Sequence, residues 1–267
     1  MSKGISLHIG MNSVDPNHYD DWDGKLNACE NDAKTMQEIA DAKEYESKIY
    51  LSNEATRQII IKEIEDITQQ LDTGDIFMFT FSGHGGQVPD YSGDERDFKD
   101  ETILLYDGQL IDDELYQLWS NFKEGVRILV LSDSCHSGTM IKAAHHNGLN
   151  FGTGQKKFMP DEIAFRTYEK NKSFYDEIAP KTDPKPPVKA TVRLISGCQD
   201  NQYSYDGTFN STFTAAVKRV WAQGNFKGDY GLFHKEVVSL LPPHQSPNHM
   251  VIGTCDTDYD NEKPFTI

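Results

Sequence analysis

The chain has 267 residues, 26 Lys and Arg against 42 Asp and Glu, and therefore a formal net charge of −16. Its length fits one large domain or two small ones, and 37% hydrophobic residues is typical of a globular protein. The excess of acid argues against nucleic acid as a partner, because phosphates would be repelled.

Strand-like and helix-like patterns alternate along the chain. Continuous apolar runs predict strands buried on both faces, and apolar residues spaced by three and four predict helices. In chain order, the patterns predict a strand at Ile5–Ile9, a helix through Cys29–Ala40, a strand at Lys48–Leu51, a helix through Ile60–Leu71, strands at Asp75–Phe81 and Thr102–Tyr106, a helix at Asp112–Phe122, strands at Arg127–Ser132 and Thr191–Ser196, helices at Thr212–Trp221 and Leu232–Leu241, and a strand at His249–Ile252. This alternation is typical of an α/β fold with a mainly parallel sheet of about six strands and helices on both faces.

The region from Ala143 to Lys189 interrupts the alternation. It is basic for this protein and contains the Pro-rich run KTDPKPPVK. One interpretation is a solvated surface insertion. The other is a cleavable linker between a part at 1–142 and a part at 190–267 that stay packed in a single domain, 1–267.

No apolar run reaches the roughly 20 residues that a membrane helix needs, and Ile76–Phe81 is among the longest. The N-terminal segment lacks the pattern of a secretory signal, so we expect a cytoplasmic protein without a membrane partner. In a reducing compartment the four cysteines are expected to be free thiols.

Two predicted strands end in loops that carry reactive side chains. The first runs into Ser82–Gly86 (SGHGG), and the second runs into Asp133–Gly138 (DSCHSG). If the two strands are parallel neighbours, His84 and Cys135 emerge at the same edge of the sheet. A cysteine nucleophile needs a histidine base and backbone N–H donors for the oxyanion, and the amides of Gly85 and Cys135 are the natural donors. Against this, a buried cysteine is more often a small hydrophobic residue.

The SGHGG and DSCHSG motifs resemble the histidine and cysteine motifs of metacaspases, whose bacterial members are called orthocaspases. Three further segments are similar to family motifs: Cys29–Ala33 (CENDA), Gly93–Glu101 (GDERDFKDE) and Ser196–Gln202 (SGCQDNQ). The resemblance spans roughly residues 5 to 255 and implies a caspase-like three-layer sandwich with cysteine endopeptidase activity. The QAC signature of aspartate-specific caspases is absent.

The resemblance implies that Cys135 is the nucleophile and His84 the general base, working as a dyad without a third acid. It also implies that a specificity pocket is lined by four side chains: Cys29, Asp32, Ser82 and Asp133. Two carboxylates on one pocket wall repel each other and are costly to desolvate unless a cation enters. We therefore expect cleavage after Arg or Lys and not after Asp.

Other interpretations of this pocket remain. Asp32 lies near a predicted helix start and could instead cap the helix. A basic residue of the protein's own permanent core in the pocket would argue against peptidase activity.

The stretch from Asp90 to Glu114 holds ten acidic residues against two basic ones. The resemblance implies calcium ligands at Asp100, Asp112 and Asp113, whereas Lys142 stands near a further ligand position and would oppose a divalent ion. The alternative is a solvated acidic face in which Asp112 and Asp113 favour a helix N-terminus. No cofactor is expected for the chemistry itself, with Ca²⁺ acting only as an activator.

These observations predict a cysteine endopeptidase that acts on proteins or peptides after Arg or Lys, and the resemblance implies that it is a monomer. The basic region offers bonds for self-cleavage at Lys156–Lys157 or at Arg166. The alternative function is a catalytically idle, caspase-like binding or scaffold protein.

Overall fold

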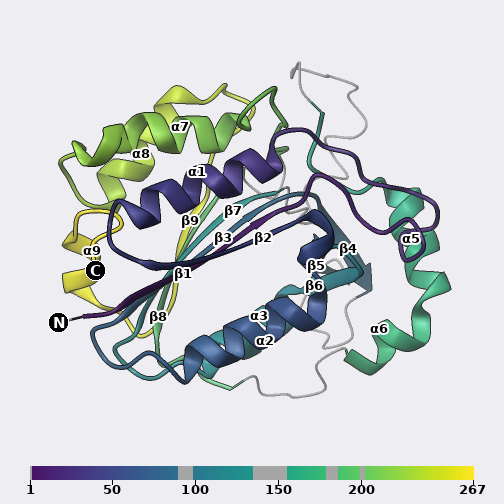
Figure 1. The fold of residues 1–267 in the computed structure, drawn as a ribbon, viewed down its shortest axis with the longest axis horizontal. Helices are drawn as coiled ribbons and strands as arrows, with labels where there is room; N and C mark the ends of the chain where they lie inside the picture. Colours follow the sequence, from purple (N-terminus) through teal and green to yellow (C-terminus); the bar gives the residue numbers. More distant parts are fainter. Residues whose placement is uncertain (1, 90–98, 135–154, 179–185, 199–201) are drawn as a thin grey trace.

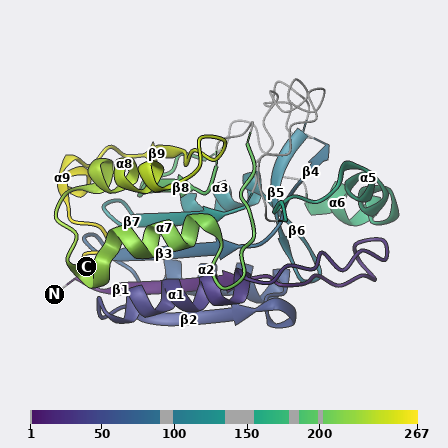
Figure 2. The same cartoon turned by 90° about the horizontal axis from the view of Figure 1, so that it is seen from above.

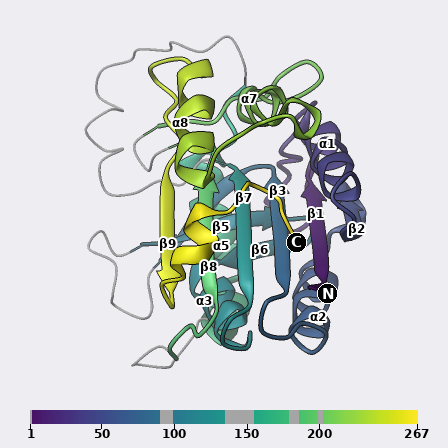
Figure 3. The same cartoon turned by 90° about the vertical axis from the view of Figure 1, so that its left-hand side faces the viewer.

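A six-stranded sheet lies at the centre of the computed structural model, which describes residues 2–89, 99–134, 155–178, 186–198 and 202–267. The strand order is β2-β1-β3-β7-β8-β9, and only β9 runs antiparallel to its neighbour (Figure 3). The strands are β1 (Gly4–Gly10), β2 (Glu46–Leu51), β3 (Ile76–Ser82), β7 (Arg127–Asp133), β8 (Thr191–Ser196) and β9 (His249–Gly253). The predicted fold class is confirmed.

Helices cover both faces of this sheet and make the outer two layers (Figure 1). One face carries α1 (Cys29–Asp41), α7 (Thr212–Trp221) and α8 (Tyr230–Leu240). The other carries α2 (Arg57–Thr68) and α3 (Asp112–Ser120), and α9 (Thr257–Asn261) lies near the C-terminus. None of the described helices has the length and apolar character needed to cross a membrane.

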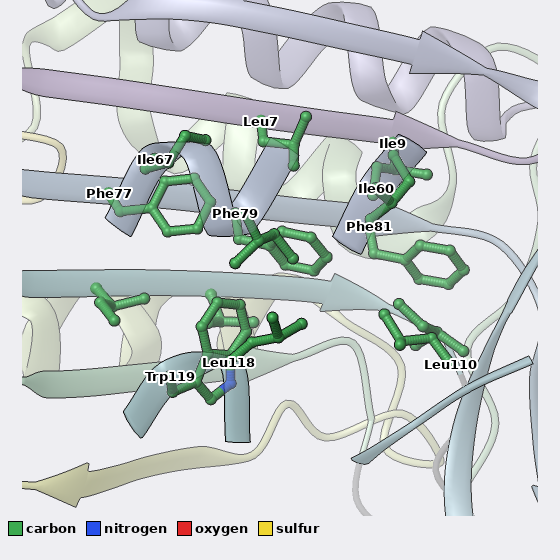
Figure 4. Packing of buried hydrophobic residues seen from close by; sticks show 14 of the residues in the cluster. Leu7, Ile9, Ile60, Ile67, Phe77, Phe79, Phe81, Leu110, Leu118 and Trp119 are labelled. Atoms are coloured by element: carbon green, nitrogen blue, oxygen red, sulfur yellow. The ribbon is translucent and has the colours of Figure 1, made fainter. Parts of the chain in front are cut away.

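The core forms where the apolar side of a helix packs on the apolar face of the sheet. Phe77, Phe79 and Phe81 alternate along β3 and so share one face of the sheet, where Ile60 and Ile67 of α2 pack against them (Figure 4). All five side chains are buried. Burial stabilises the fold by about 1.5–3 kcal/mol per large apolar side chain.

A smaller antiparallel sheet lies at the carboxyl ends of the main strands (Figure 1). It consists of β4 (Gly85–Pro89), β5 (Lys99–Leu105) and β6 (Gly108–Ile111). The sequence patterns predicted only one of these strands and placed it too late, at Thr102–Tyr106. Gly85, Gly86 and Pro89 are poor strand formers, so β4 owes its conformation to pairing with β5.

Two helices occupy the described part of the region at 143–189, where none was predicted. They are α5 (Asp161–Lys170) and α6 (Lys172–Ile178). Helix α5 packs on β4, at the end of the molecule that also holds the carboxyl ends of the parallel strands (Figure 2).

Candidate active site

The ends of three neighbouring strands bring the predicted pocket residues together. In the parallel register Ser82 lies opposite Gly10 on one side and opposite Asp133 on the other. Gly10 packs closely against the first residue of α1. A Cβ added at Gly10 would lie only 2.4 Å from the Cys29 carbonyl oxygen, so only glycine fits here. The start of α1 can therefore approach the sheet, which carries Asp32 over the ends of β3 and β7.

A lysine fills the space between the two predicted carboxylates. Lys157 is 0% exposed, and its Nζ lies 3.2 Å from Asp32 Oδ2 and 3.0 Å from Asp133 Oδ2. The same Nζ donates to Ser82 Oγ at 2.8 Å. Asp32 is 1% exposed and Asp133 2%, so neither lies on a solvated face. The pocket thus holds a cation, and that cation belongs to the chain itself.

Hydroxyl and amide groups from the second half of the chain complete the pocket wall. Ser211 donates to Asp32 through both its backbone N–H, at 2.9 Å, and its hydroxyl. Ser204 donates its hydroxyl to Asp133 Oδ1, and Thr214 donates to Oδ2 at 3.2 Å. The sequence analysis missed these residues because nothing in their local pattern marks them.

The backbone around Lys157 is paired on both sides. Its N–H donates to the Ser204 carbonyl at 3.0 Å, and its own carbonyl accepts from the Gly85 N–H at 3.0 Å. One step further out, the Asp206 N–H donates to the Gln155 carbonyl at 2.8 Å. The residues on either side of Lys157 therefore form isolated bridges, Lys156 with Tyr205 and Phe158 with Gly85, and the Lys157 carbonyl accepts from the amide that was predicted as an oxyanion donor.

Charge balance keeps the lysine protonated. Burial alone would lower the pKa of Lys157, but the carboxylates of Asp133 and Asp32 outweigh it and raise the pKa above its usual value. For Asp133, burial and the neighbouring Asp32 raise the pKa, and Lys157 opposes that shift. Two buried carboxylates thus share one cation, so removing the cation would leave them with unfavourable repulsion.

Cys29 is the first residue of α1 and is buried. Burial raises the pKa of its thiol to about 12, although Lys157 and Ser82 act in the opposite direction. A thiol with such a pKa stays protonated and unreactive near neutral pH. Cys29 can line the pocket but is not a nucleophile.

His84 lies between β3 and β4 and is 2% exposed. Its Nε2 is 3.0 Å from the Gly24 carbonyl, and the ring of Trp22 packs against it with 4.8 Å between centroids. The carbonyl requires an N–H at Nε2, which leaves Nδ1 as the acceptor. Within the described part of the chain, Nδ1 has no hydrogen-bond partner.

The imidazole of His84 is held neutral. Burial lowers the pKa of His84 to about 4, and Lys157 adds to this effect, while the carbonyls of Gly24 and Phe158 oppose it. A neutral ring is the form that can accept a proton from a thiol. Trp22 and Gly24 therefore position the ring of His84, a role that the sequence analysis did not give them.

Cys135 lies outside the described residues. The residue before it, Ser134, is described: it directly follows the end of β7 and is buried. His84 and Cys135 each follow by two residues the pair Ser82 and Asp133, which lie opposite each other in the register of β3 and β7. Adjacent strands are about 4.8 Å apart, so this register starts both loops side by side.

Asp206 ties the pocket wall to the start of α1. Its carboxylate accepts from the backbone N–H of Asn27 at 2.7 Å and from that of Ala28 at 3.0 Å. Negative charge at this point satisfies free amides and favours the helix N-terminus. The segment that pairs with residues 155–157 is thereby fixed to the helix that carries Asp32.

The predicted calcium residues lie away from this pocket, on β5 and at the start of α3. Asp100 and Asp113 are buried, and Asp112 accepts the Asp113 N–H at 2.9 Å. The described residues contain no group of three or more His, Cys, Asp or Glu that could hold a metal ion. They do not by themselves provide a calcium site, and Lys142 and Asp90–Asp97 lie outside them.

Comparison with known families matches residues 14–256 to the model of the caspase domain. A solved crystal structure of a protein from Geobacter sulfurreducens is 50% identical, has a TM-score of 0.91, and matches over 99% of this chain and 98% of that one.

Curated relatives include Metacaspase-1 of Schizosaccharomyces pombe, 27% identical over 80% of this chain and 58% of that protein. Metacaspase-1 of Plasmodium falciparum is 32% identical over 68% of this chain and 28% of that protein. Metacaspase-1 of Mycosarcoma maydis is 29% identical over 80% of this chain and 60% of that protein. The chain thus matches less than two thirds of the length of each of these relatives.

Proposed function

The chain belongs to the caspase-domain family, and from this premise we propose that it is a cysteine endopeptidase that cleaves after Lys or Arg and first cleaves itself after Lys157. The observation that carries the proposal is the position of Lys157 in the pocket. Its side chain occupies the doubly acidic pocket while its carbonyl oxygen accepts the Gly85 N–H. A substrate residue before the cut needs both contacts at once.

The position of Lys157 also favours one peptide bond among the candidates for self-cleavage. The bond from Lys157 to Phe158 has its carbonyl at the oxyanion donor. A cut after Lys156 would need a different residue in the pocket. Arg166 lies inside helix α5, with its guanidinium paired to Asp20 at 2.6 Å, so its bond is not extended. We therefore propose Lys157–Phe158 as the self-cleavage site.

The chemistry follows from the protonation states. The Cys135 thiol gives its proton to Nδ1 of His84, and the thiolate attacks the carbonyl carbon of the residue in the pocket. The Gly85 and Cys135 amides stabilise the negative oxygen. The leaving amine takes the proton from His84 and departs, which leaves a thioester on Cys135. Water then attacks the thioester with His84 as base, releasing the carboxylate and restoring the thiol.

A panel of fluorogenic peptides with Lys, Arg or Asp before the cut tests this function. We expect the self-cleaved protein to hydrolyse the Lys and Arg peptides and to leave the Asp peptide intact, because carboxylates in the pocket repel a third one. The same panel with Cys135→Ala is the control and should show no hydrolysis. Activity on the Asp peptide, or equal activity in both proteins, would contradict the proposal.

Calcium stimulation is tested in the same assay by adding Ca²⁺ or a strong chelator. A rate that rises with Ca²⁺ and falls with the chelator would support a role for Asp100, Asp112 and Asp113. A rate unaffected by chelation would remove calcium from the proposal and leave the peptidase chemistry untouched, since no step above uses a metal.

The full burial of Lys157 also favours a second function. If Lys157 is a permanent core residue, the pocket never admits a substrate, and the protein is an idle scaffold with a caspase-like fold. Breaking a permanent buried ion pair costs about 3–5 kcal/mol, because the partner charges stay buried. If a substrate cation can replace Lys157, the pocket would instead open to water and to other cations.

The variant Lys157→Ala separates the two functions. As an open pocket, it is expected to bind benzamidine, whose amidinium replaces the ammonium, and saturating benzamidine should raise the Tm by about 5 °C. Lys123→Ala, which removes an exposed ion pair with Asp72, is the matched control and should show no such shift. A Lys157→Ala protein that is strongly destabilised and does not respond to benzamidine would favour the scaffold.

A further inference from the structure

Tyr203 contacts the residues on both sides of Lys157. The Nζ of Lys156 lies 3.9 Å from the centroid of the Tyr203 ring, and the ring of Phe158 lies 6.3 Å from it at an interplanar angle of 62°. Lys157 enters the pocket, while its two neighbours, Lys156 and Phe158, both contact the same aromatic ring.

We propose that Tyr203 is a specificity-determining residue, which selects substrates with a cation before the pocket residue and an aromatic side chain after the cut. The inference rests on the proposed function and adds a substrate class to it: sequences with two successive basic residues followed by an aromatic one. The ring face attracts an ammonium or guanidinium group, and an edge-to-face contact suits the second ring.

The position of Tyr203 on the pocket wall supports this role. It directly precedes Ser204, whose carbonyl accepts the Lys157 N–H, and any bound substrate that keeps this bond would pass the same ring. Tyr205 cannot do the same, since it is buried and packs edge-on against His244 at 5.4 Å. Tyr203 is half-buried, and its ring carries the contacts to Lys156 and Phe158.

The experiment uses the self-cleaved full chain and internally quenched peptides with Lys before the cut. The preceding residue is Lys or norleucine, and the following residue is Phe or Ala. We expect kcat/KM to be about fivefold higher for Lys than for norleucine, the effect of one cation–π contact, and higher for Phe than for Ala. In Tyr203→Leu both preferences should fall to near one, whereas Tyr203→Phe should keep them.

Two controls make the result specific to the ring. Phe209→Leu removes an exposed aromatic from the neighbouring loop and should leave both preferences unchanged. On the unmodified protein, a trimethyl-lysine peptide should be preferred over its neutral all-carbon isostere, which tests the charge without any mutation. The proposal is overturned if Tyr203→Leu keeps the native preferences, or if the unmodified protein shows none. Absence of any cleavage after Lys or Arg would instead overturn the proposed function.

Discussion

On incubation, the native chain is expected to convert into two fragments, residues 1–157 and 158–267, while Cys135→Ala stays intact. The reason is that the Lys157 carbonyl already lies at the Gly85 amide, so only the thiolate and its base are needed for attack. Loss of the nucleophile should slow the cut by at least about 10³-fold. Intact mass and N-terminal sequencing, with Phe158 as the new first residue, check the result.

Three variants sharpen this test. Lys156→Ala should still be cut at the same bond, because Lys156 does not enter the pocket, and Lys157→Ala should not be cut there. Arg166→Gln should behave as the native chain. A cut after Lys156 or Arg166 would show that the chain is not cleaved with Lys157 in its observed position in the pocket. Equal nicking of the native chain and Cys135→Ala would indicate a contaminating protease.

The second large effect is expected for Asp133→Asn, measured as kcat/KM on Lys peptides. A neutral amide cannot balance the incoming ammonium, and loss of one partner of a buried ion pair costs about 3–5 kcal/mol. The rate on Lys peptides should therefore fall by at least about 100-fold. The rate on a matched norleucine peptide should change much less, because that substrate brings no charge into the pocket.

Asp133 is chosen because its carboxylate lies nearest to the Lys157 ammonium, at 3.0 Å against 3.2 Å for Asp32. Both carboxylates also accept hydrogen bonds from the second half of the chain, Asp133 from Ser204 and Thr214, so the fold of the variant is checked by its Tm. Glu38→Gln, an exposed residue paired with Lys218 at 3.4 Å, is a suitable charge-matched control. If Asp133→Asn lowers both peptide rates equally while the fold stays intact, the carboxylate does not set specificity.

The central strands of the main sheet were predictable because they are largely apolar runs. In β3 and β7 every residue is buried, and the local pattern is enough to identify them. Of the small sheet only part of β5 was predicted, and β4 was not predictable because it begins with two glycines and ends with a proline. Helices α5 and α6 were missed because the region around them is rich in turn formers and because most of their side chains face solvent.

For the site, the strand ends and the family resemblance identified Asp32, Ser82, His84 and Asp133 as candidates. The partners contributed from far along the chain could not be read locally. Lys157 reaches Asp32 across 125 residues, and Ser211 reaches it across 179. Such contacts depend on how the two parts of the sheet meet, which no short pattern records. Peptide assays and mapping of the cut bond test the roles of these residues.

The position of Lys157 in the pocket has a further consequence for any cleaved form of the protein. Hydrolysis would turn its carbonyl into a carboxylate, yet the residue would stay joined through the chain to β7. A covalently attached product of this kind competes intramolecularly, at an effective concentration on the order of millimolar. An external substrate would thus have to outcompete the enzyme's own severed end, and its apparent KM would report that competition as much as its intrinsic affinity.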